Sequence, residues 1–139
     1  LETTAICRYL ECLHPDPNLF GIDENEIAQI EMWYSRISFE LMMPLMFGFR
    51  HTHPHMSELE NQNNEFGLAQ RELAIKSLKY YDEIIADKEY IACGKFSYAD
   101  IQAVTSLQFL VRLNKIDIND YENLSNYVDN IALRPSFAK

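Results

Sequence analysis

The stretch GKFSYADI, residues 94–101, contains two helix-start devices that coincide. Ser97 and Asp100 stand three residues apart, the spacing of a capping box in which each side chain takes the backbone N–H of the other residue. Phe96 and Ile101 flank the pair with the spacing of a hydrophobic staple. The stretch therefore predicts that a helix begins at Ser97.

The same serine and aspartate could also belong to a Ser/His/Asp triad. A triad needs a histidine that takes the proton of the serine, and no histidine lies near Ser97 in the sequence. We therefore interpret this stretch as structural and not as catalytic.

Helical patterns extend in both directions from this point. IQAVTSLQFLV (101–111) is apolar on nearly all sides, which predicts a helix at the centre of a bundle. Residues 3–13 form a shorter helical pattern, and residues 14–23 form a linker with two prolines and a glycine. Asp120 is positioned to cap a last short helix.

A long helix is expected to begin at Glu24 and to end or kink near Met43, because Pro44 follows. One row of this helix is apolar and predicts core: Ile27, Ile30, Tyr34, Ile37, Leu41 and Leu45. A second row mixes charged and apolar residues: Trp33, Arg36, Glu40, Met43 and Phe47. SELE (57–60) resembles another capping box and predicts a second long helix from Ser57 to about residue 87.

Composition supports an all-α protein. The chain has 139 residues, enough for one domain with a core, and only 4 glycines and 5 prolines, few for a protein of many turns and short strands. Its net charge of −9, without a Lys/Arg cluster, argues against nucleic acid and anionic membranes as partners. No stretch approaches the ~20 apolar residues of a membrane span.

Neither the histidines nor the cysteines predict a metal site. HTHPH (51–55) is tempting, but alternating histidines in extended chain point to opposite sides, and a polar loop is the simpler reading. Cys7, Cys12 and Cys93 form no CxxC pair, so we expect free thiols in a reducing cytosol.

Glu2 and Thr3 open the first helix, and two readings of this pair remain. They could simply cap the helix. Alternatively, the free N–H groups and positive dipole end of the helix could bind a carboxylate while Glu2 holds an ammonium, which together would suit an amino-acid head group.

Four segments in this order resemble the glutathione transferase superfamily: LETTAICRYLE, EIAQIEMWYSRISFEL, YIACGKFSYADIQA and NLSNYVDNIALRPSF. The family pattern is Glu-Ser-x-Ala-Ile-x-x-Tyr-Leu, then Gly-x-x-Ser-x-Ala-Asp, then Arg-Pro-Ser, and the resemblance covers essentially the whole chain. It implies that residues 1–13 are the last helix of a thioredoxin-like domain, and that residues 24–139 are the all-helical C-terminal domain with its last helix cut short. The start at Leu1 agrees with a fragment, in which the catalytic Tyr, Ser or Cys of the family would lie upstream.

The resemblance also implies a function and a site. Thr3 would bind the γ-glutamyl carboxylate of glutathione and Glu2 its ammonium, with no metal involved. The expected whole protein is a cytoplasmic, homodimeric enzyme of detoxification that joins glutathione to a small electrophile. Arg36, Met43 and Phe47 are candidates for the wall of the electrophile pocket, although the same row could face a second subunit. The alternative is a non-catalytic member of the superfamily that acts as an interaction module.

Overall fold

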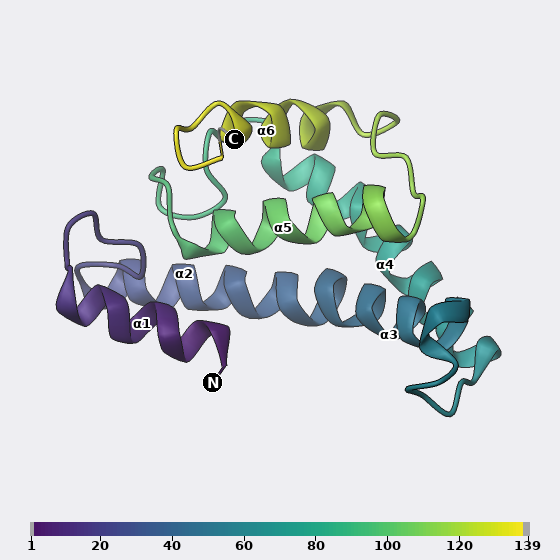
Figure 1. The fold of residues 1–139 in the computed structure, drawn as a ribbon. Helices are drawn as coiled ribbons and strands as arrows, with labels where there is room; N and C mark the ends of the chain where they lie inside the picture. The colour runs from purple at the N-terminus through teal and green to yellow at the C-terminus, as the bar shows by residue number, and fades with distance from the viewer. Residues whose placement is uncertain (1, 138–139) are drawn as a thin grey trace.

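A computed structural model describes residues 2–137, which contain helices and no strand. The α-helices are α1 (Thr3–Leu13), α2 (Glu24–Ile37), α3 (Met43–Thr52), α4 (Asn64–Ile85), α5 (Tyr98–Leu113) and α6 (Glu122–Ala132). Figure 1 shows α5 between the line of α2 and α3 on one side and α6 on the other. The all-α prediction is confirmed for these residues.

The core is built around α5, as the apolar pattern of that helix predicted. Its inward side chains are buried together with those of α2, α4 and α6. The apolar row predicted for the first long helix is largely correct, since Ile30, Ile37, Leu41 and Leu45 are buried. Ile27 is instead 43% exposed, and Trp33, from the mixed row, is buried.

Of the two outcomes expected at Pro44, an end or a kink of the helix, an end is wrong, because the helical segment continues past Pro44 with its regular α-helical turns interrupted just before it. A π-turn at Ser38–Met42 joins α2 to α3, and Pro44 lies in the first turn of α3. Proline removes one backbone N–H and its ring clashes with the carbonyl four residues earlier in a regular α-helix. The π-turn inserts a wider turn at this point, with Met43 N–H bonded to the carbonyl of Ser38.

The predicted helix start at Ser57 is wrong. The Ser57 hydroxyl donates to the carbonyl of Pro54 at 2.7 Å, and Glu60 forms an ion pair with Arg50, so neither side chain is available for a capping box. Helix α4 begins seven residues later, where the Asn63 side chain accepts the N–H of Phe66 at 3.0 Å.

The capping box predicted at Ser97 is present. The Asp100 carboxylate accepts the Ser97 backbone N–H and hydroxyl, each at 2.8 Å. Its second oxygen accepts the Ile91 N–H at 2.8 Å and the Tyr127 hydroxyl at 2.7 Å. This fully buried carboxylate therefore joins the loop before α5, the start of α5 and helix α6.

The hydrophobic staple remains a prediction. Phe96 packs beside Tyr90, with the Arg134 guanidinium 3.8 Å from the centre of its ring. Ile101 is half-buried and lies instead on the side of α5 that faces α1.

Helix α6 is capped by a residue of another helix. The cap that the sequence suggested, Asp120, is wrong. The carboxylate of Asp82, on α4, accepts the Leu124 N–H at 2.9 Å and the Asn123 side-chain amide at 3.1 Å. Asp120 is exposed, and Tyr121 occupies the N-cap position without a side-chain cap.

Candidate functional site

The N-terminal end of α1 is open to a ligand. Glu2 occupies the N-cap position and makes no side-chain cap bond, so simple capping by this residue does not occur. Thr3 and Glu2 are both exposed, and the first turn holds no acidic residue. The first backbone N–H bonded within the helix is that of Ile6, to the Glu2 carbonyl at 3.0 Å. The preceding N–H groups therefore remain for an anion.

Three hydroxyl groups fix this first turn against the bundle. The Thr4 hydroxyl lies 2.6 Å from the Tyr34 hydroxyl on α2 and 3.3 Å from the Tyr98 hydroxyl on α5. The Tyr98 ring is stacked on Phe20 of the linker with 4.5 Å between centroids. Sequence reasoning missed this cluster, because Tyr34 read as a core position and Thr4 matched no motif.

The backbone of α1 does not closely approach the backbone of any other helix, and none of the residues of α1 is buried. The other contacts of α1 are therefore made by side chains. Arg8 forms an ion pair with Glu31 and lies 4.5 Å from the centre of the Phe20 ring. Glu11 accepts the Leu19 N–H at 2.7 Å. With the contact of Thr4 and Tyr34, these pairs place α1 alongside α2 in antiparallel orientation (Figure 1).

A mostly apolar cavity of about 470 Å³ adjoins this turn, between α1, the linker and α5. Thr3, Cys7 and Leu10 form its α1 side, and Tyr98 and Ile101 form its α5 side. Ile6, Tyr9, Leu10 and Leu13 of α1 recur at helical spacing, yet they are exposed and do not belong to the bundle core.

The three residues suggested for an electrophile pocket have different surroundings. Arg36 donates to the Tyr80 hydroxyl at 2.6 Å and to Glu40 at 3.2 Å. Phe47 packs edge-on against Phe66 of α4, with 5.8 Å between ring centres. Met43 is 41% exposed.

Arg36 is thus engaged in a polar cluster with α4. Tyr81 donates to the other oxygen of Glu40 at 2.7 Å, and burial and that carboxylate raise the pKa of the Tyr81 hydroxyl above its ordinary value. Because its Nε is bonded to Glu40 and its Nη1 to Tyr80, Arg36 is a structural member of this cluster in the described chain.

The HTHPH stretch is not the extended polar loop that the sequence suggested, because His51 and Thr52 end α3 and Pro54–Met56 form a short 3-10 helix. Two of its histidines accept backbone hydrogen bonds. His51 Nδ1 accepts the Asn63 N–H at 3.1 Å, and His53 Nδ1 accepts the His55 N–H at 3.3 Å. Over residues 2–137, no three His, Cys, Asp or Glu side chains are placed to share a metal ion. The same range holds no helix long and apolar enough to cross a bilayer.

The three cysteines are unpaired. Burial raises the pKa of the Cys93 thiol, and the nearby Glu26 carboxylate raises it further. A raised pKa disfavours the thiolate, which is the reactive form. Cys93 is therefore poorly suited to act as a nucleophile.

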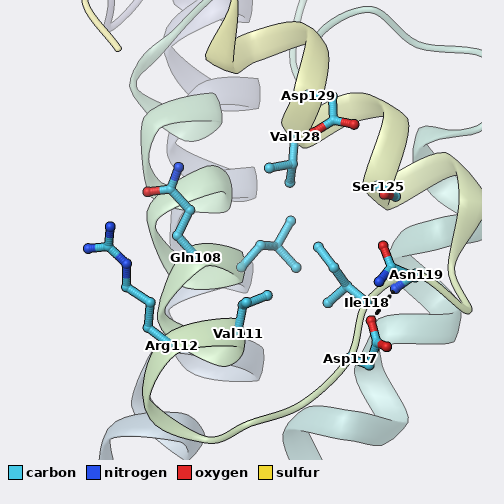
Figure 2. Close-up of a pocket in the computed structure, with 10 residues that line it drawn as sticks. Gln108, Val111, Arg112, Asp117, Ile118, Asn119, Ser125, Val128 and Asp129 are labelled. Carbon is cyan, nitrogen blue, oxygen red and sulfur yellow. Dashed lines mark hydrogen bonds between the residues drawn. The ribbon is translucent and has the colours of Figure 1, made fainter. Parts of the chain in front are cut away.

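A second groove, of about 350 Å³, lies between α5, the loop that follows it and α6. Figure 2 shows Val111, Ile118 and Val128 around its centre, with Asp129 near the α6 edge and Arg112 directed away. The Asp117 carboxylate is occupied by the Asn119 N–H at 2.9 Å. None of the candidate glutathione-site or electrophile-pocket residues named from the sequence lines this groove.

Comparison with known proteins gives one consistent family. The family model described as "Glutathione S-transferase, C-terminal domain" matches residues 30–135. Glutathione S-transferase 2 of Saccharomyces cerevisiae is 33% identical over 140 residues, which cover 99% of the chain and 60% of that protein. The chain thus spans less than two thirds of this relative.

Solved structures agree. The crystal structure of Gtt2 from Saccharomyces cerevisiae has a TM-score of 0.90 and 32% identity, over 99% of the chain and 67% of that structure. A Gtt2-class glutathione S-transferase of Vibrio parahaemolyticus has a TM-score of 0.88 and 28% identity. This match covers 100% of the chain and 66% of that structure.

Proposed function

The chain belongs to the glutathione S-transferase family, and we propose that it forms the helical part of an enzyme that transfers the glutathione thiol to a small electrophile. The observation that supports this proposal best is the open first turn of α1. A helix that only packed against its neighbours would gain from a capping side chain there, and this one leaves its donors free.

Glu2 and Thr3 would bind the γ-glutamyl end of glutathione. The free N–H groups and the positive end of the α1 dipole suit its carboxylate, and the Thr3 hydroxyl adds one more donor. The exposed Glu2 carboxylate would attract the neighbouring ammonium. No metal enters this scheme.

The domain organisation follows from the same proposal. Residues 1–13 would end a thioredoxin-like domain, residues 14–23 would link it to the helical domain, and residues 24–139 would form that domain. Residues 1, 138 and 139 of these ranges lie outside the described part of the chain. The exposed row of Ile6, Tyr9, Leu10 and Leu13 would pack against the remainder of the thioredoxin-like domain.

The group that activates the glutathione thiol would belong to that remainder of the domain. A thiolate is the nucleophilic form of sulfur, and it would attack an electrophile held beside the helical domain. We keep Met43 and Phe47 as candidates for the electrophile pocket, with Arg36 at its edge, and we propose a homodimer in the cytoplasm.

Retention of the whole protein on immobilised glutathione tests the site. Glu2→Ala should weaken retention, because it removes the carboxylate that faces the ammonium. Glu24→Ala is a matched control, since Glu24 is also an exposed glutamate at the start of a helix, in the first turn of α2. Equal retention of the two variants would remove Glu2 from the site. A protein that binds glutathione but conjugates no electrophile would support the non-catalytic alternative.

A further inference from the structure

Helix α1 contacts the rest of the bundle through a polar face. Thr4, Arg8 and Glu11 are spaced four and three residues apart, which places them on one side of the helix. Each of the three makes a polar contact with α2 or with the linker. Because none of the residues of α1 is buried, these polar contacts set where α1 lies on the bundle.

Glu11 binds the linker with both oxygens of its carboxylate. One oxygen accepts the Leu19 N–H at 2.7 Å, and the other accepts the Asn18 side-chain amide at 2.9 Å. The side-chain oxygen of Asn18 in turn accepts the Gly21 N–H at 2.8 Å. Gly21 has a φ of 100°, and a Cβ there would lie 2.5 Å from the backbone nitrogen of Ile27, so this path of the chain requires glycine. The linker is therefore held in one conformation and is not a loose tether.

The same segment of the linker is fixed to the start of α5. The Leu19 carbonyl accepts the Tyr98 N–H at 2.9 Å, and this N–H belongs to the first turn of α5, where the helix itself offers no acceptor. The buried Phe20 ring packs on the Tyr98 ring and on the Arg8 guanidinium, with 4.5 Å to the centre of the Phe20 ring in each case. Glu11 is thus connected through Leu19 to the first turn of α5.

These linker contacts lie at the opposite end of α1 from the proposed glutathione site (Figure 1). Glu11 follows Thr4 by seven residues, which corresponds to about 10 Å along the helix axis. A glutathione held by the first turn moves with α1, whereas an electrophile beside the helical domain does not. A displacement of α1 would therefore change the distance between the two reactants without removing a contact of glutathione with the first turn.

We propose that Glu11 is a positioning residue for the thiol transfer, and that it acts through the linker and Tyr98 by fixing α1 on the bundle. This inference rests on the proposed function. In the transfer, the thiolate sulfur forms a bond to the electrophilic carbon while the leaving group departs with its electron pair. Such a step depends steeply on alignment, so a small displacement of α1 slows it.

Steady-state kinetics of the whole protein, with glutathione and chlorodinitrobenzene as the probe electrophile, test this role. In Glu11→Ala, kcat/KM for the electrophile at saturating glutathione should fall about tenfold, while KM for glutathione should stay within about twofold. Glu72→Ala is the matched control, because it also removes a carboxylate from a helix, at an exposed position of α4. This control should leave both quantities unchanged.

Glu11→Gln separates positioning from a simple effect of charge. Glutamine loses the charge but keeps an oxygen that can accept the Leu19 N–H. It should therefore recover most of the rate that Glu11→Ala loses. A glutamine variant as slow as the alanine variant would refute positioning through this hydrogen bond.

Amide hydrogen exchange of Tyr98, measured by NMR without substrates, gives a readout that does not depend on activity. Exchange should be faster in Glu11→Ala than in the wild type, because the linker no longer holds the Leu19 carbonyl at the start of α5. A wild type that conjugates no electrophile would count against the proposed function, and the exchange of Tyr98 would still decide the role of Glu11. The inference is overturned if Tyr98 exchanges equally fast in both proteins, or if Glu11→Ala changes only KM for glutathione.

Discussion

Removal of the Asp100 side chain should be among the most damaging single changes in this domain. The carboxylate is fully buried and accepts four hydrogen bonds, two from Ser97 and one each from Ile91 and Tyr127. In Asp100→Ala the Ser97 hydroxyl can rotate to another acceptor. The N–H groups of Ile91 and Ser97 are fixed by the backbone, and the buried Tyr127 hydroxyl makes no other hydrogen bond among the described residues. All three donors therefore remain buried without a partner.

The expected loss follows from these three donors. Each buried, unpaired donor costs about 1–3 kcal/mol, and the relief of a buried charge offsets part of the total. We therefore expect Asp100→Ala to lower the free energy of unfolding by about 3–5 kcal/mol, which is exceptional for one substitution. Asp100→Asn keeps one acceptor oxygen and should lose about half as much, so it remains informative if the alanine variant does not fold.

Urea unfolding gives the measurement. It can be followed by the fluorescence of Trp33, the single tryptophan of the chain, and by circular dichroism. Asp120→Ala removes an exposed aspartate and should change stability by no more than about 0.5 kcal/mol. If Asp100→Ala came within about 1 kcal/mol of the wild type, the four hydrogen bonds would not stabilise the fold as argued.

Three further outcomes are expected. Asp82→Ala should lower the free energy of unfolding by about 1–2 kcal/mol, because it removes the cap of α6, and equal urea midpoints for this variant and Asp120→Ala would contradict that role. Tyr34→Phe should weaken glutathione binding several-fold in calorimetry by loosening the first turn of α1, whereas Tyr81→Phe, a loss of one hydroxyl elsewhere, should leave affinity unchanged; similar affinities would refute the positioning. Burial and the Asp100 carboxylate raise the pKa of Tyr127, so above pH ~10 the native state keeps the hydroxyl proton while the unfolded chain loses it. The free energy of unfolding should therefore fall by about 1.4 kcal/mol per pH unit above pH ~10 because of this group. Tyr127→Phe should remove this contribution to the pH dependence, measured by urea titrations between about pH 9 and 11.

The sequence was a good guide where a signal is local. The box at Ser97 and Asp100 involves residues three apart, so its geometry follows once the helix forms. On α4 the buried residues Ala74, Leu78, Tyr81 and Ile85 recur every three or four positions of the sequence, and this helical spacing alone places them on one face.

The errors arose where a distant residue took over a local role. Asp120 stands at a plausible capping position, but Asp82 of α4 lies closer to the free N–H groups of α6. Glu60 could have completed a box with Ser57, but Arg50 pairs with it instead. Contacts of this kind depend on how helices pack, which a single sequence does not reveal.

Part of the candidate site was also predictable from local sequence, and part depended on contacts between distant residues. Glu2 and Thr3 were recognisable from their place before a helix, whereas the Thr4 contacts with Tyr34 and Tyr98 span 30 and 94 residues of sequence. No short pattern records a contact of that range, so the residues that hold the site in place emerged only from the structure.

The π-turn at Ser38–Met42 has a consequence for how this chain can vary. It adds a residue inside a continuous helical segment, and one residue corresponds to a rotation of about 100° around the helix axis. Deleting a single residue in this turn would leave α2 unchanged and rotate the whole of α3, moving Leu45 out of the core and bringing a neighbouring side chain inward. Insertions and deletions are normally tolerated only in loops. Here a change of one residue would alter which side chains of α3, as far as Thr52, face the core and which face solvent.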